Sequence, residues 1–284
     1  MKKDFRGKNI VITGASGFIG SKLSKELIKL GANVHALIDQ NSSMHRIKDI
    51  QENIIIHKIK KWDQGALEKL FNNINPNIIF HLRAAINPAS GQEAQKNFFL
   101  QVNFKQTKEL VNASFKFNLE SFVNTGTIAE YGATSTPFKE NKKAEPISEY
   151  GETKLAATKW IQSFSQKSNF PAVLIRSSVV YGPGQTPYSY LVPNVIMSCL
   201  KGEDFHIPSS GLQTRDPLFV DDDVQGLIAA AVSPKAKSEI INLGLGKEYT
   251  VVGIARIVNN QFGNPINITT GSKIDRPGEN KNYW

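Results

Sequence analysis

Short apolar runs alternate with longer amphipathic stretches from residue 10 to residue 178. The runs are rich in β-branched residues and are bounded by polar or turn-forming residues, which is typical of buried strands. They predict strands at Ile10–Thr13, Val34–Ile38, Ile54–Ile59, Ile78–Leu82, Phe122–Thr125 and Val173–Arg176. Apolar residues at helical spacing predict helices at Phe18–Leu30, Ala66–Phe71, Asn97–Phe117 and Tyr150–Ser165. Strands that alternate with helices predict an α/β fold with a doubly wound parallel sheet, the Rossmann arrangement.

The alternation changes after Gly182. A stretch rich in proline, glycine and tyrosine leads into an apolar helix at Val192–Leu200 and a short segment at Asp204–Arg215. A strand and a helix return at Phe219–Val232, and further elements follow at Ile240–Gly246 and Thr250–Phe262. We therefore expect a first domain of residues 1–178, to which 216–243 return, and a smaller interleaved C-terminal domain of residues 179–215 and 244–284.

Three glycines lie between the first predicted strand and the first predicted helix. Gly14 permits a tight turn, Gly17 lets a pyrophosphate approach the backbone, and Gly20 lets the helix pack closely on the strand. The anion then rests on the helix N-terminus. The sequence thus predicts a dinucleotide-binding domain, with a cofactor loop made of Gly14, Ser16, Gly17, Phe18, Ile19 and Gly20.

Asp39 lies near the end of the second predicted strand, 19 residues beyond Gly20. A carboxylate at this place binds the adenosine ribose hydroxyls and repels a 2′-phosphate, which favours NAD over NADP. Asp39 can also be read as an ordinary loop residue. The nearby His45, Arg46 and Lys48 can receive a phosphate, so NADP is not excluded.

Tyr150 and Lys154 are four residues apart in a predicted helix and therefore share one face. An ammonium close to a phenol stabilises the phenolate and lowers the tyrosine pKa, which makes the tyrosine a usable proton donor or acceptor beside an alcohol or carbonyl. Taken alone, this spacing is equally typical of a solvated helix face. Its position behind the glycine loop favours the catalytic interpretation.

Further short motifs follow in order along nearly the whole chain. They are His81–Ala85, Val102–Asn103, Asn124–Thr127, Tyr131–Gly132, Arg176, Val180–Pro183, Arg215–Asp216, Val220–Asp222, Asn242–Gly244 and Arg276–Glu279. With these motifs, the glycine loop and the Tyr150/Lys154 pair, the chain resembles the extended short-chain dehydrogenase/reductase family. That family contains the nucleotide-sugar epimerases, dehydratases and ketoreductases.

The resemblance implies a role for each matching residue. Tyr150 would move the proton of the reacting sugar oxygen, Thr127 would hydrogen-bond that oxygen, and Lys154 would hold the nicotinamide ribose as well as tune Tyr150. The remaining implied residues are Leu82 and Arg83 beside the dinucleotide, Arg215 and Arg276 as clamps on the substrate diphosphate, and Tyr181 in the sugar pocket. His206 and Cys199 are interpreted as structural.

The chain also departs from the family pattern. Ile128 and Ala129 follow Thr127 where dehydratases carry Asp-Glu, and Ala129 stands where decarboxylases carry Glu, so both reactions are disfavoured. Other departures concern binding: Ile38 at the usual acidic position of strand two, Lys60 in place of an adenine-contacting Asp, Arg83 in place of a small residue, and Ser177 and Val179 in place of Pro and Asn.

These observations favour an NAD(P)-dependent enzyme that acts at C4 of a nucleotide-diphosphate sugar through a 4-keto species. A sugar 4-epimerase is the first interpretation and a 4-keto-sugar reductase is the alternative, since both use Thr127, Tyr150 and Lys154. A non-catalytic dinucleotide-binding regulatory protein is a further alternative. It predicts that replacing Tyr150 changes nothing.

Composition and charge exclude several other classes of protein. The formal net charge is +9, and residues 1–61 carry 12 lysines and arginines against 5 acidic residues. No aromatic and basic stripe accompanies this charge, so nucleic acid is not expected as a partner. The single cysteine excludes an internal disulfide framework, no metal site is predicted, and no apolar run is long enough for a membrane span. We expect a cytoplasmic enzyme, and the resemblance implies a homodimer and a further C-terminal stretch beyond Trp284.

Overall fold

A computed structural model describes residues 5–86, 92–186, 190–272 and 282–283 of the 284-residue chain. Its centre is a seven-stranded sheet with the order β11-β6-β5-β4-β1-β2-β3, in which every neighbouring pair is parallel. The strands are β1 (Asn9–Thr13), β2 (Asn33–Asp39), β3 (Ile55–Ile59), β4 (Ile78–His81), β5 (Ser121–Thr127), β6 (Ala172–Ser177) and β11 (Ile240–Leu243). The order reverses between β1 and β4, and ligands of doubly wound sheets bind at the carboxyl ends of the strands beside such a point.

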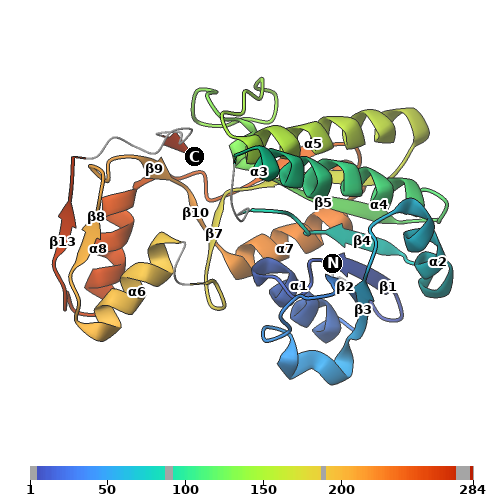
Figure 1. Cartoon of the computed structure of the whole chain (residues 1–284), viewed down its shortest axis with the longest axis horizontal. Coiled ribbons are helices and arrows are strands. Elements are labelled where there is room, and N and C mark those ends of the chain that lie inside the picture. Colours follow the sequence, from blue (N-terminus) through green and yellow to red (C-terminus); the bar gives the residue numbers. More distant parts are fainter. Residues whose placement is uncertain (1–4, 87–91, 187–189, 273–281, 284) are drawn as a thin grey trace.

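Helices cover both faces of this sheet (Figure 1). α1 (Phe18–Lys29) and α7 (Val220–Ala231) lie on one face, and α2 (Gln64–Ile74), α3 (Gln92–Phe99), α4 (Gln106–Ser114) and α5 (Glu149–Ser168) lie on the other. Ile10 and Ile12 pack towards α1 and α7, whereas Val11 packs towards α2, α4 and α5. Both faces of the sheet are buried, which explains why its strands are apolar runs without polar alternation.

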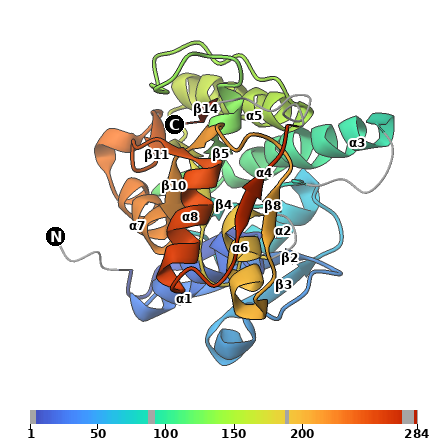
Figure 2. The ribbon, with the colours of Figure 1, turned by 90° about the vertical axis from the view of Figure 1, so that its left-hand side faces the viewer.

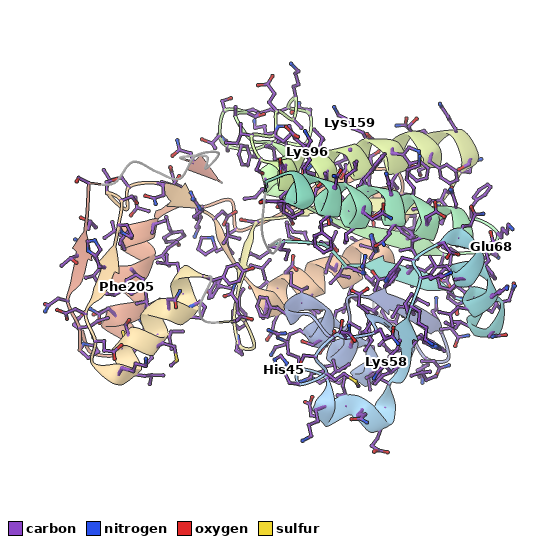
Figure 3. All side chains as sticks on the ribbon, in the orientation of Figure 1. His45, Lys58, Glu68, Lys96, Lys159 and Phe205 are labelled. Atoms are coloured by element: carbon purple, nitrogen blue, oxygen red, sulfur yellow. The ribbon has the colours of Figure 1, made fainter. Side chains whose placement is uncertain are left out.

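A smaller part lies beside the carboxyl ends of the large sheet, as the two views in Figures 1 and 2 agree. Its helices are α6 (Leu191–Lys201) and α8 (Val251–Gln261), and its core contains Val195, Cys199, Val252 and Ala255. Figure 3 places Phe205 in this part and Lys58, Glu68, Lys96 and Lys159 in the part around the large sheet. Short strands complete it: β7 (Val179–Tyr181) with β10 (Pro217–Phe219), β8 (Phe205–Ile207) with β13 (Ile268–Thr270), and β9 (Thr214–Arg215) with β12 (Tyr249–Thr250) and β14 (Asn282–Tyr283).

The predicted α/β fold with a doubly wound parallel sheet is confirmed. Two elements differ from the sequence prediction. The single helix expected at 97–117 is α3 and α4, joined by a π-helical turn at Leu100–Lys105. The connection between β2 and β3 contains a 3₁₀ helix at Lys48–Asn53 that the apolar pattern did not indicate. Within the residues described, no helix has the length and apolar character that crossing a bilayer requires.

Candidate active site

The glycine loop joins β1 to α1 at the reversal point of the sheet. Gly14 has a φ of +73°, and a Cβ on Gly20 would collide with the Gly14 carbonyl oxygen. A Cβ on Gly17 would lie 3.0 Å from the same oxygen. Gly17 is the N-cap of α1 and supplies no side-chain cap, so the amide groups of the first turn are open to an anion. This loop fits the pyrophosphate of a dinucleotide.

A cavity of about 630 Å³ lies at the carboxyl ends of the strands, in the range of small-molecule sites. It brings together all ten residues that were predicted for the cofactor. These are Gly14, Ser16, Gly17, Phe18, Ile19, Gly20, Asp39, Leu82, Arg83 and Lys154. Asp39 is the last residue of β2, and Ile38 is 1% exposed in the core, so Asp39 rather than residue 38 faces the cavity.

Thr127, Tyr150 and Lys154 line the same cavity. Thr127 ends β5 and shares a hydrogen bond with Tyr150 at the start of α5. The ring of Tyr150 packs against Phe99 and Val102. Lys154, one turn further along α5, is buried and donates from Nζ to the Thr125 carbonyl oxygen over 2.6 Å. Three side chains that were singled out from separate motifs therefore meet at one point.

Burial has the largest effect on the pKa values of Tyr150 and Lys154. It raises the pKa of Tyr150, an effect that the charge of Glu130 increases and the hydrogen bond with Thr127 opposes. Burial lowers the pKa of Lys154 to about 8, and Glu130 partly offsets this change. The sequence predicted that Lys154 lowers the pKa of Tyr150. In this structure the ammonium is bonded to the backbone instead, and the pKa of the phenol lies above its ordinary value.

Glu130 is a residue that the sequence analysis missed. Its fully buried carboxylate forms an ion pair with Arg176, with 2.9 Å between Arg176 Nε and Oε2. Oε1 accepts hydrogen bonds from the backbone N–H of Thr127 and from the Thr158 hydroxyl, each over 3.1 Å. Glu130 and Thr127 form a capping box around the short 3₁₀ turn Ile128–Glu130. The Thr-x-x-Glu spacing is a recognised signal of this motif and was available in the sequence.

The predicted substrate residues are distributed differently. Arg215 lines the cavity from β9. Tyr181 packs edge-on against Phe219, with 5.7 Å between ring centroids, and is not among the residues that line the cavity. Tyr190 lines it instead, close enough to Tyr150 for their charges to interact. Arg276 lies outside the described residues.

Comparison with known proteins identifies the family. The model of the NAD dependent epimerase/dehydratase family matches residues 10–244, which is most of the chain. The chain belongs to this family. The predicted NAD cofactor and the prediction of an enzyme of the extended short-chain dehydrogenase type, which was read as a nucleotide-sugar epimerase or ketoreductase, are confirmed at the level of the family, whose members include epimerases and dehydratases.

Individual members of the family differ in their reactions. The chain is 28% identical to an uncharacterised UDP-glucose epimerase of Bacillus subtilis (strain 168), over 97% of this chain and 88% of that protein. It is 29% identical to human dTDP-D-glucose 4,6-dehydratase, over 88% of this chain and 72% of that protein. Among solved structures, a Bacillus cereus UDP-glucuronic acid 4-epimerase in complex with UDP-glucuronic acid and NAD is similar, with a TM-score of 0.84, 27% identity and coverage of 97% of this chain and 89% of that one.

Trp62 and Arg46 make side-chain contacts at the cavity that the sequence motifs did not indicate. Trp62, which follows β3, donates from Nε1 to Asp39 Oδ1 over 2.7 Å. Arg46 follows β2 and donates from Nε to the Gly184 carbonyl oxygen over 2.8 Å and from Nη2 to Thr186 Oγ1 over 2.9 Å. Arg46, Gly184 and Thr186 belong to segments far apart in the sequence, so only the folded chain reveals these contacts.

Proposed function

We propose that the protein is a nucleotide-sugar 4-epimerase that uses tightly held NAD. The observation that carries this proposal is the set of side chains on the turn after Thr127. Ile128 and Ala129 line the cavity there, and the one acid of the turn, Glu130, is withdrawn into the ion pair with Arg176. The site therefore offers groups for moving one proton at a sugar hydroxyl, and this turn offers no carboxylate for eliminating water or assisting decarboxylation.

The residues divide the work as follows. The amide groups at the N-terminus of α1 bind the pyrophosphate, and Asp39 accepts from the adenosine ribose. When bound, NAD supplies a hydride acceptor and donor for C4 of the sugar. Thr127 orients the C4 oxygen through its hydroxyl, and Tyr150 takes and returns the proton of that oxygen. Arg215 meets the substrate diphosphate with a planar fork of donors.

Lys154 completes the set through its charge. With a pKa of about 8 it is mostly an ammonium at neutral pH, and it lies in the same cavity as the Tyr150 phenol. A cation near a phenol favours the phenolate and opposes the effect of burial on the pKa of Tyr150. We infer that Lys154 exchanges its bond to the Thr125 carbonyl for the cofactor ribose.

An epimerase keeps its cofactor, whereas a ketoreductase must exchange NAD(P)H at every turnover, and two features of the site favour retention of NAD. Asp39 presents a carboxylate that disfavours NADP, and Arg46 connects the segment after β2 to the segment after β7 beside the cavity. The similarity to proteins named as epimerases, among them the Bacillus cereus UDP-glucuronic acid 4-epimerase, supports this assignment.

The test begins with the nucleotide that copurifies with the protein, identified after denaturation, and continues with a panel of UDP-, dTDP-, CDP- and GDP-sugars. The proposal predicts bound NAD and interconversion of two C4 epimers without added cofactor. The Tyr150→Phe variant should retain NAD and lose conversion by a factor of about a thousand, the size of an acid–base contribution. Oxidation of added NADPH by a 4-keto sugar, with no epimer formed, would overturn the proposal.

A further inference from the structure

Asp39 and Arg83 form a bidentate ion pair at the end of the cavity away from Tyr150. Arg83 Nε lies 3.0 Å from both carboxylate oxygens of Asp39, and Nη2 lies 2.9 Å from Oδ1. Trp62 Nε1 donates to the same Oδ1 over 2.7 Å. Oδ1 therefore accepts from three donors and Oδ2 from one, which leaves Oδ2 with capacity for a further donor.

The guanidinium of Arg83 is fixed by contacts with Asp39, Gln106 and Trp62. Its side chain is 12% exposed, Nη1 donates to Gln106 Oε1 over 2.6 Å, and the guanidinium lies over the Trp62 ring at 4.4 Å from the centroid. These partners come from the end of β2, the segment after β3 and the start of α4. The guanidinium is thus fixed before any ligand arrives, which reduces the entropy that binding costs.

A guanidinium fork fits a carboxylate and a phosphate with the same geometry. In this chain the fork lines the cofactor cavity, and the Asp39 carboxylate occupies it. The Asp39 side chain is 47% exposed, so a ligand in the cavity meets its charge directly. An anion brought to this place is repelled by Asp39, although the part-buried guanidinium of Arg83 is hydrogen-bonded to that carboxylate.

We propose that Arg83 is a phosphate-binding arginine covered by Asp39, and that this pair decides between NAD and NADP. While the carboxylate occupies the fork, the adenosine ribose must carry a free 2′-hydroxyl, which Oδ2 accepts. When the charge of residue 39 is removed, the fork becomes a site for the 2′-phosphate of NADP. Arg83 is then a residue that determines the specificity for NAD or NADP, and its effect on NADP⁺ binding depends on whether residue 39 carries a negative charge.

The test measures equilibrium binding of NAD⁺ and NADP⁺ by titration calorimetry on the full chain after removal of copurified nucleotide. The wild type should bind NAD⁺ at least tenfold more tightly than NADP⁺. In Asp39→Asn the ratio of the two affinities should shift towards NADP⁺ by about a hundredfold, because a charged hydrogen-bonding pair replaces a repulsion. Asp39→Ser should give the same shift and serves if the first variant does not fold.

The decisive comparison is between two double variants that each remove one positive charge. The Asp39→Asn/Arg83→Gln double variant should bind NADP⁺ at least tenfold more weakly than Asp39→Asn does, and should bind NAD⁺ as tightly as Asp39→Asn does. Asp39→Asn with Lys69→Gln, which alters an exposed lysine of α2 outside the cavity lining, should keep the gain. Equal NADP⁺ affinity in Asp39→Asn and Asp39→Asn/Arg83→Gln would overturn the inference, as would a wild type that does not prefer NAD⁺.

This inference rests on the proposed function only in that the cavity takes a dinucleotide, and it is measured without turnover. A protein that prefers NAD⁺ and gains Arg83-dependent NADP⁺ affinity in Asp39→Asn, but does not interconvert C4 epimers, contradicts the proposed function alone. A protein that epimerises, yet in which the Arg83 substitution leaves NADP⁺ binding to Asp39→Asn unchanged, contradicts the inference alone.

Discussion

The Glu130 carboxylate supports the reacting groups without facing the cavity. It fixes the backbone of Thr127, pairs with Arg176 and raises the pKa of both Tyr150 and Lys154 by its charge. Arg176 in turn lies under the Tyr131 ring, 4.4 Å from its centroid. A buried acid beside a catalytic turn can therefore have a structural role and an electrostatic role at once, and its position in the sequence alone does not reveal that it points away from the cavity.

Replacement of Glu130 by glutamine should destabilise the protein by about 3–5 kcal/mol, because it leaves the buried Arg176 without a counter-ion. Urea denaturation followed by circular dichroism measures the loss. The double variant Glu130→Gln/Arg176→Met removes both charges and should recover most of it. A Glu130→Gln protein within 1 kcal/mol of the wild type would contradict the description of this pair.

The depressed pKa of Lys154 predicts a pH dependence of stability in the nucleotide-free protein. Below pH 8 the ammonium is charged in both the folded and unfolded states, and burial makes it costly. Between about pH 8 and 10.5 the folded state loses this proton while the unfolded state keeps it, so the contribution to stability rises with pH. The Lys154→Met variant lacks this rise. The difference in unfolding free energy between the two proteins should change by up to roughly 3 kcal/mol across that window, and a constant difference would contradict the assigned pKa.

At the scale of elements, the cofactor loop and the strand order follow from local rules. The apolar β-branched runs predicted the parallel strands, and the three glycines predicted the turn between β1 and α1. Both elements could be predicted because they depend on residues that are neighbours in the sequence. The π-helical turn at Leu100–Lys105 was not predictable in this way. Its buried Asn103 exchanges hydrogen bonds with both backbone groups of Ala85, a contact with the segment after β4 that the helical period does not encode.

The close packing of α1 on β1 should be lost on substitution of Gly20 by alanine. The new Cβ would meet the Gly14 carbonyl oxygen, which is backbone and cannot move away cheaply. We expect a destabilisation of about 1–3 kcal/mol and an NAD⁺ affinity at least tenfold lower. Gly65→Ala in α2 is the matched control, since its Cβ would lie 3.7 Å from the nearest atom, Asp63 Oδ1. It should be neutral or more stable by up to about 1 kcal/mol. Equal effects of the two substitutions would refute the packing argument.

At the scale of the whole molecule, the site exists only because distant segments meet. Asp39, Trp62, Arg83 and Gln106 form one network, and no spacing in the sequence joins them. Tyr181, which was predicted for the sugar pocket, is not among the residues that line the cavity in this structure. A tyrosine was expected in the segment that crosses to the small part, but its register is set by the pairing of β7 with β10, which turns Tyr181 onto Phe219. The proposed division into domains stays a prediction.

Arg46 connects two cavity-lining segments that lie about 140 positions apart in the chain. Its replacement by alanine removes two hydrogen bonds and should accelerate release of bound nucleotide by about tenfold. Stopped-flow displacement measures this rate, with Lys69→Ala on α2, outside the cavity lining, as a control of equal charge change. Identical release rates in the wild type and the Arg46→Ala variant would contradict a retaining role.

The most direct test of the proposed reaction is proton NMR of a UDP-hexose incubated with the purified protein in D₂O without added cofactor. A 4-epimerase that returns the abstracted hydride to the opposite face produces the second C4 epimer, and the hydrogen at C4 remains protium. The Tyr150→Phe variant should show no conversion. Appearance of a 4-keto-6-deoxy sugar, or deuterium at C4 of the product, would contradict the proposed function.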